Sequence, residues 1–335
     1  MGRSWVTRDE MNPILLNTQI LIYLLSEAIV FVLAVVAFVV AVEIMLRWDF
    51  GAFTSRQFAL ERRAYLVMSI IGFMVIIKIV LLPYFVFAID NLSVLVPGAM
   101  CAAGVISAND YGLKLLFLKL VILFLLLVWQ AFDRYDLQAK NYPILRQKTA
   151  LYLVVFFLFA VELWLDIAYL THIDIHQPVS CCSALFGQLE GANPLPFGLS
   201  RPMLLVLFYL LYVLSMIATL ARQPWVLLPV LGVFVAVAYY AVVYFFGTYV
   251  YALPTHKCPF CMFQPEYHYV GYLIWGMLFG GVYLGATAAI ERLWPGYIDV
   301  GRERWSLGLL SGFVVLVSGY VLVYWLQHGV LLEAI

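Results

Sequence analysis

The chain has 335 residues, of which 65% are hydrophobic and only 11% are charged, and its 19 basic and 19 acidic side chains give a formal net charge of zero. Average soluble domains carry about 25% charged residues, so this composition excludes the soluble globular classes. Disorder is excluded too, because it requires low hydrophobicity and high net charge. We therefore predict an all-α polytopic integral membrane protein that has the lipid bilayer around it and does not bind nucleic acid.

Apolar runs long enough to cross about 30 Å of hydrocarbon occur eight times along the chain. Within a bilayer each backbone polar group must be satisfied inside its own segment, which favours helices for continuous apolar runs. The predicted transmembrane helices are residues 14–46, 66–90, 112–132, 149–171, 203–221, 225–251, 268–290 and 306–327. No internal repeat or flexible linker composition interrupts them, so we expect one membrane domain over residues 1–335.

Lysine and arginine predict the orientation, because cytoplasmic loops are enriched in both. The connections after the first, third, fifth and seventh spans hold 12 basic residues: Arg47, Arg56, Arg62, Arg63, Arg134, Lys140, Arg146, Lys148, Arg222, Arg292, Arg302 and Arg304. The other three connections hold only Arg201 and Lys257, with Lys114 near a span end. Both termini and these three connections are therefore predicted to lie outside, which is the periplasm if the membrane is a bacterial inner membrane.

All five cysteines fall in the predicted outer connections. Cys101 lies in 91–111, the adjacent Cys181 and Cys182 lie in 172–202, and Cys258 and Cys261 lie in 252–267. If cysteines were only small apolar fillers, some should fall in the spans that make up most of the chain. We therefore expect the three loops to converge into one thiol site on an oxidising face. The alternative is a set of structural disulfides, which an odd number of cysteines cannot complete within one chain.

Residues 258–261 read Cys-Pro-Phe-Cys, a spacing that places two thiols on one side of a helical turn. Pro259 suits a first helical position, which predicts Cys258 at a helix N-terminus where backbone N–H groups lower the pKa of a thiol. The pattern predicts Cys258 as the attacking thiolate and Cys261 as the resolving thiol. We expect Cys181 and Cys182 to relay electrons and count Cys101 among the catalytic cysteines.

The four residues Cys-Pro-Phe-Cys resemble the active-site Cys-Pro-x-Cys of thioredoxin-superfamily proteins such as glutaredoxins. The cysteine pairs in outer loops and at helix ends are similar in kind to those of quinone-coupled membrane thiol oxidoreductases of the DsbB and vitamin K epoxide reductase types. This chain differs in its eight predicted spans, since those cores are four-helix bundles, and in its adjacent Cys181 and Cys182. The resemblance implies a thiol–disulfide oxidoreductase with a quinone cofactor and a periplasmic thiol protein as its partner.

Two other functions fit the same loops. His256, Cys258 and Cys261 form His-x-Cys-x-x-Cys, which together with Cys181 and Cys182 is a ligand set suited to zinc or copper. That set favours a protein that binds or transports a soft metal ion. The third candidate is a membrane anchor subunit of a respiratory or biogenesis complex, in which the disulfides are structural.

Five Asp, Glu or Lys residues lie inside the first four spans, away from the span ends: Glu27, Lys78, Lys119, Glu162 and Asp166. Such residues are costly in a membrane and mark functional sites by default. One interpretation is a cofactor site for a proton or a quinone, and the other is a set of ion pairs that fix helix register. Glu162 and Asp166 share a helix face and repel each other unless a cation or a proton lies between them.

Glycines recur with small-xxx-small spacing in the seventh predicted span, at Gly276 and Gly280 and again at Gly281 and Gly285. Such pairs let helix backbones approach closely. We expect them to pack the bundle internally, with dimerisation as the alternative.

Overall fold

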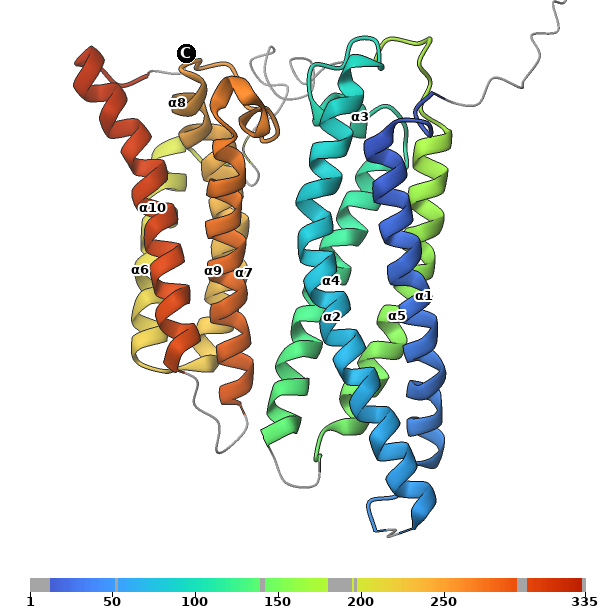
Figure 1. Ribbon diagram of the computed structural model, residues 1–335. Helices are drawn as coiled ribbons and strands as arrows, with labels where there is room; N and C mark the ends of the chain where they lie inside the picture. Colours follow the sequence, from blue (N-terminus) through green and yellow to red (C-terminus); the bar gives the residue numbers. More distant parts are fainter. Residues whose placement is uncertain are drawn as a thin grey trace, which may run out of the picture. The chain divides into compact units, whose positions relative to one another are not determined.

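The computed structural model describes residues 13–51, 54–138, 142–179, 195, 198–293 and 300–332, and within these ranges its regular structure is entirely helical. Eight segments are long and apolar enough to cross a membrane, as the sequence predicts (Figure 1). They are α1 (Thr18–Arg47), α2 (Ser55–Asn91), α4 (Gly112–Gln138), α5 (Leu145–Thr171), α6 (Arg201–Leu220), α7 (Pro224–Ala241) with its continuation to Tyr251, α9 (Val270–Arg292) and α10 (Val300–His328).

The helices extend beyond the predicted apolar runs where a local signal starts them earlier. α2 begins at Ser55 rather than near residue 66, because the Thr54 hydroxyl accepts the Gln57 N–H at 3.3 Å and caps the helix. Its first turns carry Arg56, Arg62 and Arg63, which hydropathy assigns to a loop. Hydropathy therefore measures the apolar length of a helix and not its full length.

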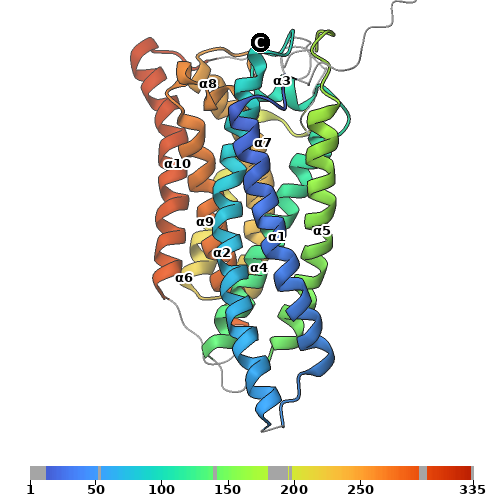
Figure 2. The same cartoon turned by 45° about the vertical axis from the view of Figure 1, so that its right-hand side comes forward.

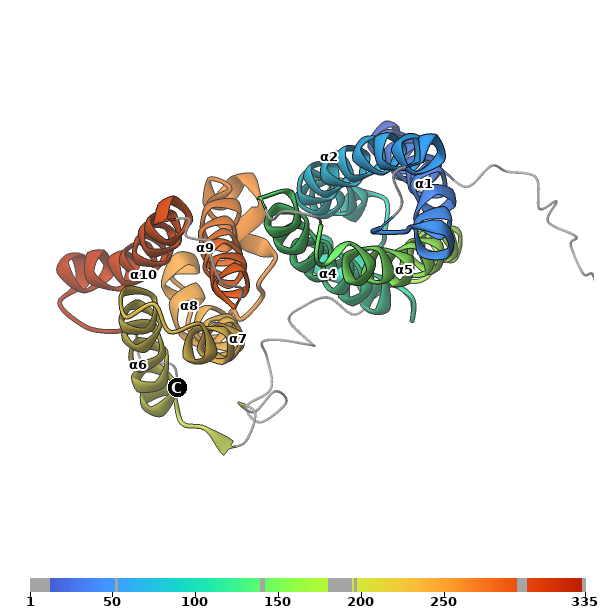
Figure 3. The ribbon, with the colours of Figure 1, turned by 90° about the horizontal axis from the view of Figure 1, so that it is seen from below.

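The chain divides into two compact units. The first comprises Met1–Trp48, Phe53–Leu123 and Leu153–Val179, so it takes α1, α2, the first part of α4 and the last part of α5. These helices surround a common centre (Figure 3), and α1 and α2 lie side by side (Figure 2). The second unit contains the bundle of α6, α7, α9 and α10. The expectation that the chain forms one membrane domain stays a prediction.

The polarity of α1 is reversed relative to a helix of a soluble protein. Leu25, Val32 and Val39, spaced seven residues apart on one face, are 64%, 62% and 61% exposed. The opposite face buries Tyr23 and Glu27 among small apolar residues. Apolar side chains thus face outward and the charged side chain faces inward, which is the arrangement that a lipid surrounding favours.

Two of the four spaced glycines in α9, Gly281 and Gly285, lie where a Cβ would be closer than 3.0 Å to a neighbouring helix. A Cβ on Gly281 would come within 2.8 Å of Leu310, and a Cβ on Gly285 would come within 2.7 Å of the Ser306 hydroxyl, both on α10. Gly276, in contrast, has open space at its Cβ position. The expected internal packing is therefore confirmed for Gly281 and Gly285.

Candidate functional site

The Cys-Pro-Phe-Cys motif lies in a loop of the second unit. α7 continues through a π-helix, Val242–Phe246, into α8 (Gly247–Tyr251), which ends where Ala252 adopts a left-handed conformation with φ 51°. The chain then makes two 3-10 turns, Cys261–Phe263 and Pro265–Tyr267, before α9 begins. The motif therefore connects two helices that are long enough to span the membrane.

The expectation that Cys258 begins a helix is wrong. The helical turn starts at Cys261, has Phe260 at its N-cap position and lasts three residues. Pro265 explains this short turn, because a residue before proline is pushed out of the helical conformation. Gln264 is accordingly extended, with φ −82° and ψ 157°. The Cys258 sulfur instead accepts the Phe260 N–H at 3.4 Å.

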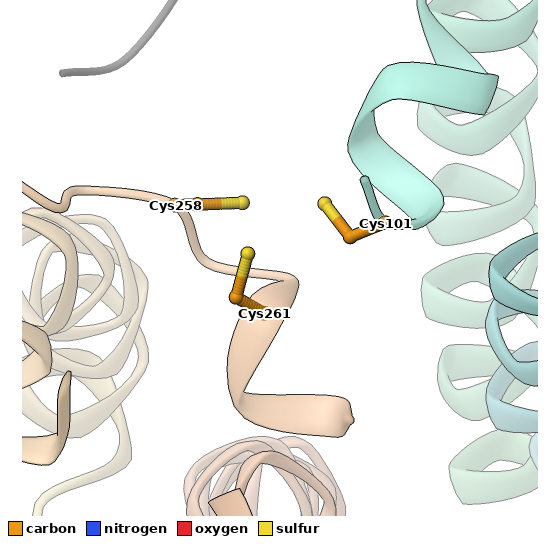
Figure 4. A group of neighbouring side chains, drawn as sticks. All are labelled: Cys101, Cys258 and Cys261. Carbon is orange, nitrogen blue, oxygen red and sulfur yellow. The ribbon is translucent and has the colours of Figure 1, made fainter. Parts of the chain in front are cut away.

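The spacing of the two cysteines nevertheless brings their sulfurs together. The Sγ atoms of Cys258 and Cys261 lie within 4.8 Å of each other and both side chains are buried (Figure 4). An S–S bond is about 2.05 Å long, so side-chain rotation with a small loop adjustment would close it. The two sulfurs are therefore close enough for a disulfide to form after such a movement.

One tyrosine holds both ends of the motif. The Tyr251 hydroxyl donates to the Cys258 carbonyl and accepts the Met262 N–H at 3.1 Å. Its ring is held edge-on by His256, with centroids 4.3 Å apart, and by Tyr267, with centroids 4.8 Å apart. Cys258 and the residue after Cys261 are thus tied to the end of α8 through one buried side chain.

The first turn of α9 supports the loop from the other side. A Cβ on Gly271 would lie 2.7 Å from Met262 Cγ and 2.9 Å from the Met262 carbonyl carbon and oxygen. A flexible side chain could move away, whereas the carbonyl belongs to the loop backbone. Glycine at position 271 is therefore what allows this close approach.

Charged and titratable groups surround the loop. The Lys257 ammonium lies 5.3 Å from the centre of the Tyr244 ring. Burial lowers the pKa of Lys257, and the positive charge of Arg201 lowers it further. Burial raises the pKa of Tyr267, with smaller contributions in the same direction from Cys261 and Glu266. His256, the imidazole of the predicted metal set, packs its ring against Tyr251.

The other three cysteines are placed differently. Cys101 belongs to the first unit, where it is buried directly before the short helix α3 (Ala102–Ile106). The Ala102 N–H donates to the Asp90 carboxylate at 2.8 Å and so fixes the start of α3. Cys181 and Cys182 lie outside the residues that the structure describes. The convergence of the outer loops and the electron relay therefore stay predictions.

The five charged residues predicted inside the first four spans, Glu27, Lys78, Lys119, Glu162 and Asp166, come together in the first unit. Lys78 contacts Glu27 and lies 2.7 Å from Glu162 Oε2. Lys119 lies 2.9 Å from Glu162 Oε1 and 3.0 Å from Asp166 Oδ2, so it is the cation that separates the two acids of α5. No member is more than 6% exposed. We call these five residues the charge cluster.

Aromatic side chains complete the charge cluster, and none of them was among the residues predicted from the sequence. The Tyr23 hydroxyl oxygen lies 2.8 Å from Asp166 Oδ1 and 3.2 Å from Glu27 Oε1. The rings of Phe159 and Phe85 face the ammonium groups of Lys78 and Lys119, at 5.1 Å in each case. The i, i+4 spacing of Tyr23 and Glu27 on α1 was the available signal for the tyrosine.

A small cavity adjoins the charge cluster. It offers about 10 Å³, which is close to the space that one water molecule needs. Glu27, Lys78, Lys119 and Glu162 form its polar wall, and its apolar wall consists of Leu81, Leu82, Ile122 and Leu123.

In the part of the chain that the structure describes, eight helices are long and apolar enough to span a membrane, which is consistent with an integral membrane protein. Comparison with protein-family models, with curated proteins and with solved structures finds no match to this chain.

Proposed function

We propose that the chain is a membrane thiol–disulfide oxidoreductase in which Cys258 and Cys261 alternate between a dithiol and a disulfide. The approach of their sulfurs to within 4.8 Å carries this proposal. The basic residues of the alternate connections support a periplasmic position for the loop, with both termini outside a bacterial inner membrane.

In the proposed reaction a dithiol of a periplasmic protein is oxidised. Its thiolate attacks Cys258, the Cys258–Cys261 bond breaks, and a mixed disulfide forms on Cys258. The second thiolate of the partner then attacks its own linked sulfur and releases Cys258, so the partner loses two electrons and two protons to the cysteine pair. Reoxidation of Cys258 and Cys261 to the disulfide needs an acceptor of two electrons and two protons, and a lipid-soluble quinone, reduced to a quinol, would supply that chemistry.

The surroundings of the two sulfurs favour Cys258 as the residue that carries the mixed disulfide. Its sulfur accepts the Phe260 N–H, and Lys257 places a positive charge next to it in the chain. Both features favour a sulfur that bears negative charge when it attacks or leaves.

Single serine variants test this assignment in native membranes. In Cys261→Ser the Cys258 thiolate can still attack the disulfide of the oxidised partner, which is the reverse of the last step, and no Cys261 thiol is present to displace the partner. This variant should therefore accumulate a mixed disulfide with a periplasmic thiol protein, whereas Cys258→Ser should not. The Cys258→Ser/Cys261→Ser double variant is the matched control and should form no mixed disulfide. Accumulation in neither variant of the pair would contradict the proposal.

The reduction potential provides a second test. A redox-active pair should titrate as a two-electron couple above about −300 mV, whereas structural disulfides of secreted proteins usually lie below that value. Added quinone should reoxidise the reduced pair in membranes. A potential well below about −300 mV, together with full activity of a Cys258→Ser/Cys261→Ser double variant, would favour the anchor subunit. Stoichiometric zinc or copper after purification without chelator, lost on His256→Ala, would favour the metal protein.

A further inference from the structure

The charge cluster of the first unit contains one more acid than base. Glu27, Glu162 and Asp166 supply three carboxyl groups, and Lys78 and Lys119 supply two ammonium groups. With every group ionised the cluster carries one negative charge. An unneutralised charge at such burial, within helices that span a membrane, is strongly disfavoured.

Tyr23 also has one hydrogen atom too few for its two contacts with ionised carboxylates. The tyrosine has one O–H, and its oxygen lies within hydrogen-bond distance of both Asp166 Oδ1 and Glu27 Oε1. An ionised carboxylate only accepts hydrogen bonds. If Glu27 and Asp166 are both ionised, one of the two O···O contacts has no hydrogen between its atoms. A carboxylic acid at either residue supplies the missing hydrogen and removes the excess charge.

A metal ion fits the same place less well than a proton does. One oxygen from each of Glu27, Glu162 and Asp166 lies within 4.8 Å of the others, which is a spacing that a cation could bridge. However, the ammonium groups of Lys78 and Lys119 already contact these carboxylates and would repel a further cation. A proton adds no volume. The adjoining cavity has room for about one water molecule, through which a proton can reach Glu27 or Glu162.

We propose that the charge cluster binds one exchangeable proton, shared by Glu27 and Asp166 through the Tyr23 hydroxyl. The titratable groups that face this proton come from all four helices around it: Tyr23 and Glu27 from α1, Lys78 from α2, Lys119 from α4, and Glu162 and Asp166 from α5. The site lies wholly in the first unit, so it does not depend on the proposed chemistry of Cys258 and Cys261.

Infrared difference spectroscopy of the purified protein in lipid tests the proposal, because a protonated carboxylic acid absorbs apart from a carboxylate and shifts in D2O. The number of protonated carboxyls should equal the number of acids minus the number of lysines. Relative to the wild type, Asp166→Asn and Glu27→Gln should each lose one carboxylic acid signal. Lys119→Met should gain one, and Lys119→Met/Asp166→Asn should return to the wild-type intensity.

Two controls separate this proton from others. Lys119→Arg keeps the charge and should keep the wild-type signal. Asp136→Asn removes a buried acid that pairs with Lys148 in the second unit. When Asp166→Asn is added to Asp136→Asn, it should remove the same signal as it removes from the wild type. An unchanged spectrum in both Asp166→Asn and Glu27→Gln would overturn the proposal and leave a purely structural ion network. These two variants decide the question even if Lys119→Met does not fold.

Discussion

Tyr251 connects the two ends of the thiol motif through one hydroxyl group, which makes it the residue to test. Tyr251→Phe keeps the ring contacts with His256 and Tyr267 but leaves the Cys258 carbonyl and the Met262 N–H without this partner. An unsatisfied buried polar group costs about 1–3 kcal/mol. We expect hydrogen exchange at the Met262 amide to accelerate by about tenfold or more, since 1.4 kcal/mol corresponds to a factor of ten.

Tyr267→Phe is the matched control for this prediction. It retains an aromatic ring against Tyr251 and leaves the two Tyr251 hydrogen bonds in place. Unchanged exchange at Met262 in Tyr251→Phe would show that the hydroxyl does not hold the loop.

At the scale of the element, the start of α9 determines how closely the helix approaches the thiol loop. Gly271→Ala places a Cβ against the Met262 carbonyl, which must shift by several tenths of an ångström. Overpacking of this kind costs about 1–3 kcal/mol. We expect slower formation of the Cys258–Cys261 disulfide, measured as the rate of closure with oxidised glutathione.

Gly276→Ala, on the same helix, is the control because its Cβ would meet no neighbouring atom within 4 Å. This variant should close its disulfide at the wild-type rate and gain slightly in helix propensity, by roughly 1 kcal/mol at most. Equal rates of disulfide closure in Gly271→Ala and Gly276→Ala would show that α9 does not hold the loop in position.

The helix pair α9–α10 gives a second prediction at this scale. Gly285→Leu would drive a large side chain into the Ser306 hydroxyl and Leu231, so it should lower the thermal stability of the purified protein. The loss should be about 1–3 kcal/mol or more, as for other overpacked cores. Gly276→Leu is the control, and a loss as large as that of Gly285→Leu would contradict the packing role assigned to Gly285.

For the whole molecule the testable property is orientation. In a cysteine-free background, a cysteine at Asp174 should react with a membrane-impermeant maleimide from outside, whereas a cysteine at Arg222 should react only after the membrane is opened. The reason is the concentration of lysine and arginine in the connections that include Arg222. Reaction of the Arg222 site from outside would reverse the topology, place the Cys258 loop in the cytoplasm and remove its oxidising surroundings.

The sequence alone determined the features that depend on local composition and spacing. Eight apolar runs predict eight helices because the requirement for internal hydrogen bonding acts on each segment by itself. The proximity of Cys258 and Cys261 follows from their separation by two residues. The helix start predicted at Cys258 was wrong, although Pro265 restricts Gln264 whatever the surrounding fold and limits the helical turn at Cys261 to three residues.

Only the tertiary structure decided which distant residues meet. The sequence identified Glu27, Lys78, Lys119, Glu162 and Asp166 as costly, but their pairing depends on helix rotation and register, which the packing of four helices sets. Tyr23 joins them because its face of α1 points inward. Gly271 and Gly276 have the same residue type on the same helix, yet only Gly271 meets a carbonyl. Contacts of this kind arise from how helix surfaces fit together, and residue type and spacing along a single helix do not specify that fit.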